Sequence, residues 1–144
     1  MTGKQPKRKP RPGVDSHGRA PLHYAAVTGD LATVRRLIAE GAHPDLADDN
    51  GMTPLHFAAQ ESRVEVALAL LDAGASVDPV DAHGNTPLSK AVFNSRGHGA
   101  LIAALRERGA NPTRQNHHGV SPLSLARTIA NFDVAQFFKD LPSG

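Results

Sequence analysis

The chain has 144 residues, the length of one domain, and its 16 basic and 14 acidic side chains leave a formal net charge of +2. It contains no cysteine, which excludes disulfides, thiol nucleophiles and thiolate metal sites. No apolar run approaches the roughly 18 to 20 residues of a membrane span, and no apolar segment follows the charged N-terminus as a secretory signal requires. We therefore expect a cytoplasmic protein or, in a eukaryote, a nuclear one.

Residues 1–13 differ in composition from the rest of the chain. They carry five basic side chains and no acidic one, and three prolines exclude a regular helix. This composition predicts a disordered tail. The run KRKPRP has three interpretations: a nuclear import signal, a tether to nucleic acid or anionic membrane, or a solubilising leader. The leader is favoured, because five charges without an aromatic residue specify no target.

Residues 14–144 form a single domain in which one pattern occurs four times. Gly18, Gly51 and Gly84 are 33 residues apart, and Gly119 follows 35 residues later. These intervals divide the domain into repeats 15–47, 48–80, 81–114 and 115–144. After the four glycines come, in order, the segments APLHYAA, TPLHFAA, TPLSKAV and SPLSLAR. A period of this length indicates a stack of similar structural units.

Each repeat is predicted to contain two short helices. In the second repeat, Thr53 as N-cap and Pro54 at the first helical position predict a helix over residues 54–60. Apolar residues at three- and four-residue spacing predict another helix over 64–72, which Gly74 ends. Neither reaches the roughly 12 residues that an isolated helix needs, so both must pack on neighbouring repeats. The first repeat has Ala20 at the capping position, which weakens its first helix.

The last two repeats depart from the pattern. The third contains two extra residues, placed within segment 94–99, NSRGHG, which is either a specific contact or a neutral bulge. The fourth ends with Phe132, Phe137 and Phe138. One interpretation of these phenylalanines is a binding patch. The favoured one is that they close the end of the core, because a terminal repeat must cover the last layer.

The four segments resemble the ankyrin-repeat family, which has a T-P-L-H-x-A motif and a period of about 33 residues. The resemblance covers almost the whole chain. It implies an all-α solenoid of helix-turn-helix units with β-hairpin finger loops. It also implies that His23 and His56 are structural and bond backbone and hydroxyl groups between repeats. Ser89 and Ser124 occupy the same place in the later repeats, so this network should weaken towards the C-terminus.

Neither catalysis nor a bound cofactor or metal is expected. The sequence has no nucleophile elbow, no phosphate-binding loop with lysine and no H-E-x-x-H motif, so we do not expect an enzyme. The finger-tip histidines stand one repeat apart, too far for zinc ligands at ~2.1 Å. His117 and His118 are adjacent, but neighbours on a hairpin point apart. A pH response through the finger-tip histidines is a weaker alternative.

The family resemblance implies that a partner binds in the concave groove formed by the finger tips and the first helices. The candidate partner-binding residues are His17, Arg19, Asp49, Met52, Gln60, Glu61, His83, Asn85, Phe93, Asn94, His117 and His118. Met52 and Phe93 are the expected apolar anchors within a polar rim. The alternative for Phe93 is that it packs beneath segment 94–99.

The favoured function is a free-standing protein–protein interaction module that is monomeric alone and binds one partner protein. One alternative is a stoichiometric enzyme inhibitor, such as a bacterial toxin-immunity-type protein. Another is a scaffold tethered to nucleic acid or anionic membrane by residues 1–13. Met52→Arg combined with Phe93→Glu should abolish binding through the groove, whereas removal of residues 1–13 should abolish a tethering function.

Overall fold

A computed structural model of the protein describes residues 11–142, and within that range the chain is all-helical. The elements in chain order are α1 (Pro21–Thr28), α2 (Leu31–Ala39), α3 (Pro54–Gln60), α4 (Val64–Asp72), α5 (Pro87–Phe93), α6 (Ala100–Glu107), α7 (Pro122–Thr128) and the 3-10 helix η1 (Val134–Phe138). Helices α3 and α4 have the bounds that the sequence predicts, so the assignment of two short helices to the second repeat is confirmed.

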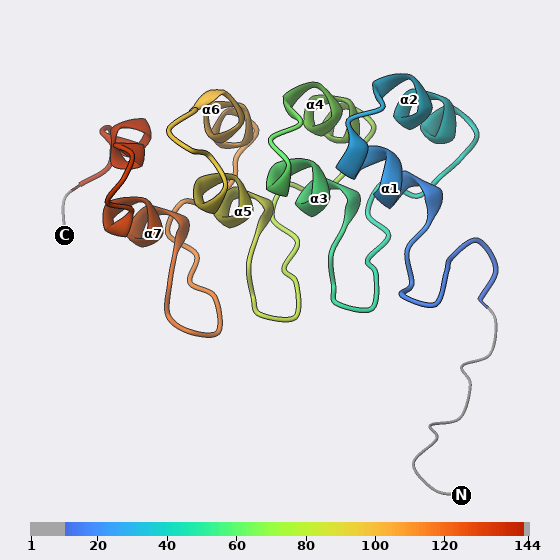
Figure 1. Cartoon of the computed structure of the whole chain (residues 1–144), viewed down its shortest axis with the longest axis horizontal. Helices are drawn as coiled ribbons and strands as arrows, with labels where there is room; N and C mark the ends of the chain where they lie inside the picture. The colour runs from blue at the N-terminus through green and yellow to red at the C-terminus, as the bar shows by residue number, and fades with distance from the viewer. Residues whose placement is uncertain (1–10, 143–144) are drawn as a thin grey trace, which may run out of the picture.

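The helices form two rows, with the loops on one side (Figure 1). Helices α1, α3, α5 and α7 lie next to one another in one row, and α2, α4 and α6 lie in the second row above them. Each first-row helix packs against the next one and against the second-row helix of its own repeat. This arrangement confirms the helical solenoid, because each short helix obtains its buried face from the neighbouring repeats.

The first helix of each repeat starts at a proline, and in three repeats a hydroxyl caps it. The side-chain oxygens of Thr53, Thr86 and Ser121 accept the backbone N–H of the third helical residue at 3.3, 3.3 and 3.1 Å. Ala20 provides no such cap. The first repeat therefore begins without this hydrogen bond, as the sequence predicts.

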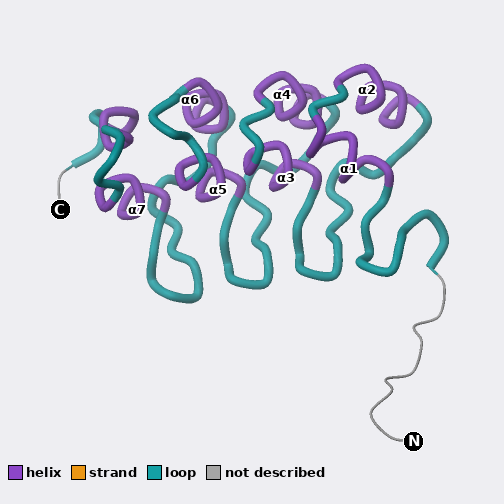
Figure 2. Tube along the Cα trace, viewed as in Figure 1, coloured by secondary structure: helices purple, strands orange, loops and turns teal. Residues whose placement is uncertain are grey.

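The fingers, meaning the loops that precede the first helices, are closed by an acidic or amide side chain. One oxygen of Asp48 accepts the N–H groups of Asn50 and Met52 at 2.9 and 2.8 Å. Asp15, Asp81 and Asn116 make the same pair of bonds in the other repeats. The predicted β-hairpins are not confirmed: Figure 2 shows loops and no strand in the described part of the chain. Side-chain turns replace them.

Two buried histidines join consecutive repeats. His23 Nε2 donates to the carbonyl of Met52 at 3.1 Å, and His56 Nε2 donates to that of Asn85 at 2.8 Å. In each ring Nδ1 accepts a backbone N–H, from Ala20 at 2.9 Å and from Thr53 at 3.1 Å. Burial lowers the pKa of both histidines. Protonation would also cost the bond at Nδ1, so both imidazoles serve the fold in their neutral form.

The fourth repeat ends differently from the others. Its second helix is replaced by the 3-10 helix η1, which contributes the buried side chains of Val134 and Phe138. Phe137 is half-buried. The expectation that three phenylalanines close the core is therefore correct for Phe138 and wrong for Phe132, which is 44% exposed.

The predicted disordered tail lies mostly outside the described residues, because residues 1–10 are not described. Arg11 is described, and its guanidinium donates to both carboxylate oxygens of Asp49 at 2.8 and 3.1 Å. The expectation of disorder is therefore wrong for Arg11, which is paired with the finger of the second repeat. Local composition does not predict this pairing, because it depends on a contact between residues distant in sequence.

Candidate functional site

A hollow of about 650 Å³ opens where the first helices of the second, third and fourth repeats meet the fingers of the third and fourth repeats. Six of the residues around it were predicted from the sequence as partner-binding: Gln60, Glu61, Asn85, Phe93, Asn94 and His118. The remaining lining residues are Ser89, Lys90, Asn116, Val120 and Leu125. The structure thus brings half of the candidate residues together at one place.

Phe93 is the most exposed large apolar side chain in the described part of the chain. It is the last residue of α5, and 70% of its surface is exposed to solvent. It does not pack beneath segment 94–99, so that alternative is wrong. Exposure of this much aromatic surface is unfavourable in an isolated protein, which makes Phe93 a candidate contact for another molecule.

A second hollow of about 400 Å³ begins on the other side of Phe93. Phe93 and Leu125 line both hollows, which therefore form one continuous surface, called here the C-terminal groove. Arg96, Ile129 and Phe132 also line the second hollow. The groove thus combines exposed aromatic and partly buried aliphatic side chains with polar and charged ones, as protein-binding sites do.

The groove opens at the junction where serine replaces a bridging histidine. Ser89 stands where His56 stands one repeat earlier, and its hydrogen bonds remain within its own repeat, with Thr86. Within residues 11–142 it makes none to the finger of the fourth repeat. That finger is held instead by Asn116, which donates to Asn85 Oδ1 at 2.9 Å. A serine side chain is much smaller than an imidazole, which leaves the space open.

Segment 94–99 has a fixed position beside the groove. Arg96 and Gly97 both have positive φ, at 51° and 86°. A Cβ on Gly97 would lie 3.1 Å from the Phe132 ring, and one on Gly99 would overlap the Phe137 ring. The two glycines therefore let the segment approach the last repeat closely. The inserted residues are packed against the protein and are not a loose bulge.

Lys90 lies at the floor of the groove and is paired. Its Nζ is 3.3 Å from Asp81 Oδ2. Burial alone would raise the pKa of the Asp81 carboxyl, but the N–H groups of Asn85 and His83 and the charge of Lys90 lower it overall. Lys90 is therefore occupied in fixing the finger of its own repeat.

Comparison with known families gives one match. Two overlapping segments, residues 6–81 and 22–116, match the family described as ankyrin repeats in three copies. The chain belongs to the ankyrin-repeat family. No curated protein matches it. Ankyrin repeats are generally protein–protein interaction modules, and ankyrin-repeat proteins are typically binding modules without catalytic activity.

Met52 is the clearest departure from the predicted ankyrin groove. It is only 8% exposed and packs in the core, so its prediction as an exposed anchor is wrong. The finger turn directs its side chain inward, while its carbonyl holds His23. A substitution by arginine would place a charge in the core, so Met52→Arg would disturb folding and cannot test binding.

The other predicted residues in the first two repeats mainly hold fingers in place. Arg19 Nε donates to Asp48 at 3.1 Å, and its guanidinium lies 5.3 Å from the centre of the Phe57 ring. The carbonyl of His17 accepts the N–H of Asp49 at 2.9 Å. Asp49 also binds Arg11, so His17, Arg19 and Asp49 all take part in intramolecular contacts.

The remaining predicted residues are finger-tip histidines. The rings of His83 and His118 stack with centroids 6.3 Å apart. The N–H of His117 donates to the carbonyl of His83 at 3.0 Å and so joins the last two fingers. In the described part of the chain, no group of three or more histidine, aspartate or glutamate side chains is arranged to hold a metal ion.

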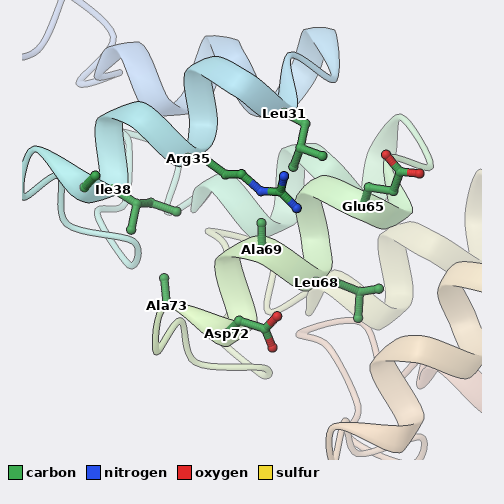
Figure 3. Close-up of a pocket in the computed structure, with 9 residues that line it drawn as sticks. Leu31, Arg35, Ile38, Glu65, Leu68, Ala69, Asp72 and Ala73 are labelled. Carbon is green, nitrogen blue, oxygen red and sulfur yellow. The ribbon is translucent and has the colours of Figure 1, made fainter.

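A further hollow lies on the outer face and was not predicted. It has a volume of about 710 Å³ and lies between α2 and α4. Figure 3 shows Arg35 extending from α2 towards α4, with Leu31 and Ala69 nearby. At the rim Asp72 is already paired with Arg108 at 2.8 Å.

None of the described helices is long and apolar enough to cross a membrane.

Proposed function

We propose that the protein binds one partner protein through the C-terminal groove, with Phe93 as the central anchor. The observation that carries this proposal is the exposure of Phe93 at 70% between two hollows of an ankyrin stack. Interfaces concentrate their binding free energy in a few aromatic side chains surrounded by polar groups that exclude water. Asn85, Asn94 and Asn116 provide such polar groups around the first hollow.

The groove is largely pre-formed, which favours tight binding. Asn116 fixes the finger of the fourth repeat, and the Lys90–Asp81 pair fixes the floor of the groove. Segment 94–99 is packed against the rings of the last repeat. Ordering this surface would therefore cost little free energy when a partner binds. We propose that the module acts by covering or holding its partner. If the partner is an enzyme, its activity should be assayed for inhibition by the module. The absence of cysteine suits a reducing cytoplasm or nucleus.

The test is capture of the partner from the native cell by the parent chain and by Phe93→Glu. Val80→Glu is the matched control, because Val80 is also an exposed apolar residue, at 37%, but lies outside the groove. We expect stoichiometric capture by the parent and by Val80→Glu, and loss of capture with Phe93→Glu. Capture that is unaffected by Phe93→Glu would refute the proposal.

The tethering alternative is tested in the same experiment with a chain that lacks residues 1–10. This truncation retains Arg11 and its pair with Asp49. If the groove is the site, the truncated chain captures the same partner at low and high salt. Loss of capture on truncation, together with a steep dependence on salt, would instead support attachment through the basic segment.

A further inference from the structure

The C-terminal groove carries opposite charges at its two ends. Glu61 lines only the first hollow and Arg96 only the second, with Phe93 and Leu125 between them. Both charged side chains belong to exposed residues. Among residues 11–142, neither has an ion-pair partner, and the only hydrogen bond to the Glu61 carboxylate comes from its neighbour Gln60, at 3.5 Å. They are therefore available to a bound molecule.

Three other basic groups in this part of the stack are paired with carboxylates. Arg106 donates to Asp140 at 2.7 Å, Arg108 to Asp72 at 2.8 Å, and Lys90 lies 3.3 Å from Asp81. Glu61 and Arg96, by contrast, place free charges of opposite sign on either side of an apolar surface. Such an arrangement selects partners by charge order, because a like charge at either end is repelled.

The separation of the two charges follows from the helix packing. Glu61 is the C-cap of α3, and Arg96 lies two residues beyond Asn94, the C-cap of α5. Packed helices lie about 8 to 10 Å apart. An extended peptide rises about 3.3 Å per residue. One helix spacing thus corresponds to about three residues of an extended segment.

We propose that the groove binds an extended segment of the partner protein with a basic side chain, an apolar anchor and an acidic side chain in that spatial order. The basic group pairs with Glu61, the apolar group packs against Phe93 and Leu125, and the acidic group accepts from Arg96. Opposite charges in the segment are about three residues apart. This inference rests on the proposed function and assigns the inserted residues of the third repeat a role in specificity.

Arg96 suits this role because its backbone is fixed. Gly97 lies so close to the Phe132 ring that a Cβ on it would be 3.1 Å away, which places the segment against the last repeat. A guanidinium donates two parallel hydrogen bonds to a carboxylate, which adds geometric selectivity. Nucleic acid fits the groove poorly, because Glu61 repels phosphate and the one lysine on its floor is already paired.

The probe is a displayed library of random twelve-residue peptides, selected on the full chain. Selections are run on the parent, Phe93→Glu, Arg96→Glu and the double variant Glu61→Lys with Arg96→Glu. We expect the parent to enrich peptides with an apolar residue between a basic and an acidic one. Arg96→Glu should replace the acidic preference by a basic one, and the double variant should reverse both preferences.

One enriched peptide is then synthesised and titrated by calorimetry. Arg96→Glu should weaken its binding about tenfold, because a charge-assisted bond is lost and repulsion replaces it. Replacing the acidic residue of the peptide by lysine should restore binding to Arg96→Glu and weaken binding to the parent. Thermal unfolding of each variant verifies that the fold is retained.

The outcomes separate this inference from the proposed function. If peptides bind through Phe93 but the charge preference is unchanged by Arg96→Glu, the charge-order inference is refuted and the groove remains the site. If binding does not depend on Phe93, both fail. If no peptide is enriched above the Phe93→Glu background, the groove does not take an extended segment and the inference is refuted. The proposed function is then decided by the cellular capture experiment.

Discussion

The first two repeats and the last two share a fold but differ in how completely their junctions are filled. His23 and His56 connect the first two repeats to the fingers that follow them, and each ring uses both nitrogens. At the next junction, among the described residues, Ser89 bonds only within its own repeat, and a hollow lies beside it. The comparison indicates that the binding surface arises where the repeat pattern is least regular.

The irregularities of the last two repeats have a common effect. The serine leaves space, segment 94–99 adds a charged side chain beside that space, and η1 replaces a full helix at the end. Phe93 and Phe132 are both exposed in this part of the chain. We expect the first half of the chain to supply more of the stability and the second half to supply the binding site.

The largest expected effect is on the core. Leu55→Ala removes a fully buried side chain in the middle of the stack and should reduce the free energy of unfolding by about 4 kcal/mol. Leu123→Ala, at the equivalent position of the last repeat and 8% exposed, should cost about 2 kcal/mol, because the end of the stack relaxes more easily. Urea unfolding measures both. Equal losses would contradict the proposed difference between the halves.

Acid should weaken the histidine junctions selectively. Burial lowers the pKa of His23 and His56 in the folded state, so below the unfolded value of about 6.5 the unfolded chain binds more protons. The free energy of unfolding should therefore fall between pH 7.5 and pH 5.5. His56→Ser, which introduces the residue of the third and fourth repeats, should reduce this fall. A pH dependence identical in parent and variant would show that His56 is not responsible.

The smallest expected effect comes from restoring the regular pattern. Ser89→His should add a bond to the next finger, raise the free energy of unfolding by about 1 kcal/mol and fill part of the hollow. Partner capture should weaken at the same time. Ser124→His is the control, because no described finger follows the last repeat. If Ser89→His stabilises the protein but does not diminish partner capture, the hollow is not part of the binding site.

Local patterns sufficed to predict much of the fold. Thr53, Pro54 and the apolar spacing after them predicted both helices of the second repeat with their observed bounds. The missing cap at Ala20 was also predictable, because capping depends on one side chain and the adjacent backbone. The β-hairpin form of the fingers is not confirmed, because an aspartate or asparagine can close a turn with its own side chain.

The site was predictable only in part. The position of Phe93 and its neighbours in the groove can be predicted from the repeat register, because the end of each first helix faces the groove. Met52 was misassigned because the direction of a side chain in a turn is set by the tertiary contacts around it. The Arg11–Asp49 pair and the Arg96 side of the groove depend on which distant segments meet, and a local pattern does not contain that information.

Amide hydrogen exchange of the protein, alone and in complex with its captured partner, locates the partner-binding surface. Binding at the C-terminal groove predicts additional protection in residues 85–96 and 116–129, which surround this groove. It predicts no change in α2 and α4, which line the outer hollow in Figure 3. Protection confined to α2 and α4, with none near Phe93, would contradict the account and place the partner on the opposite face.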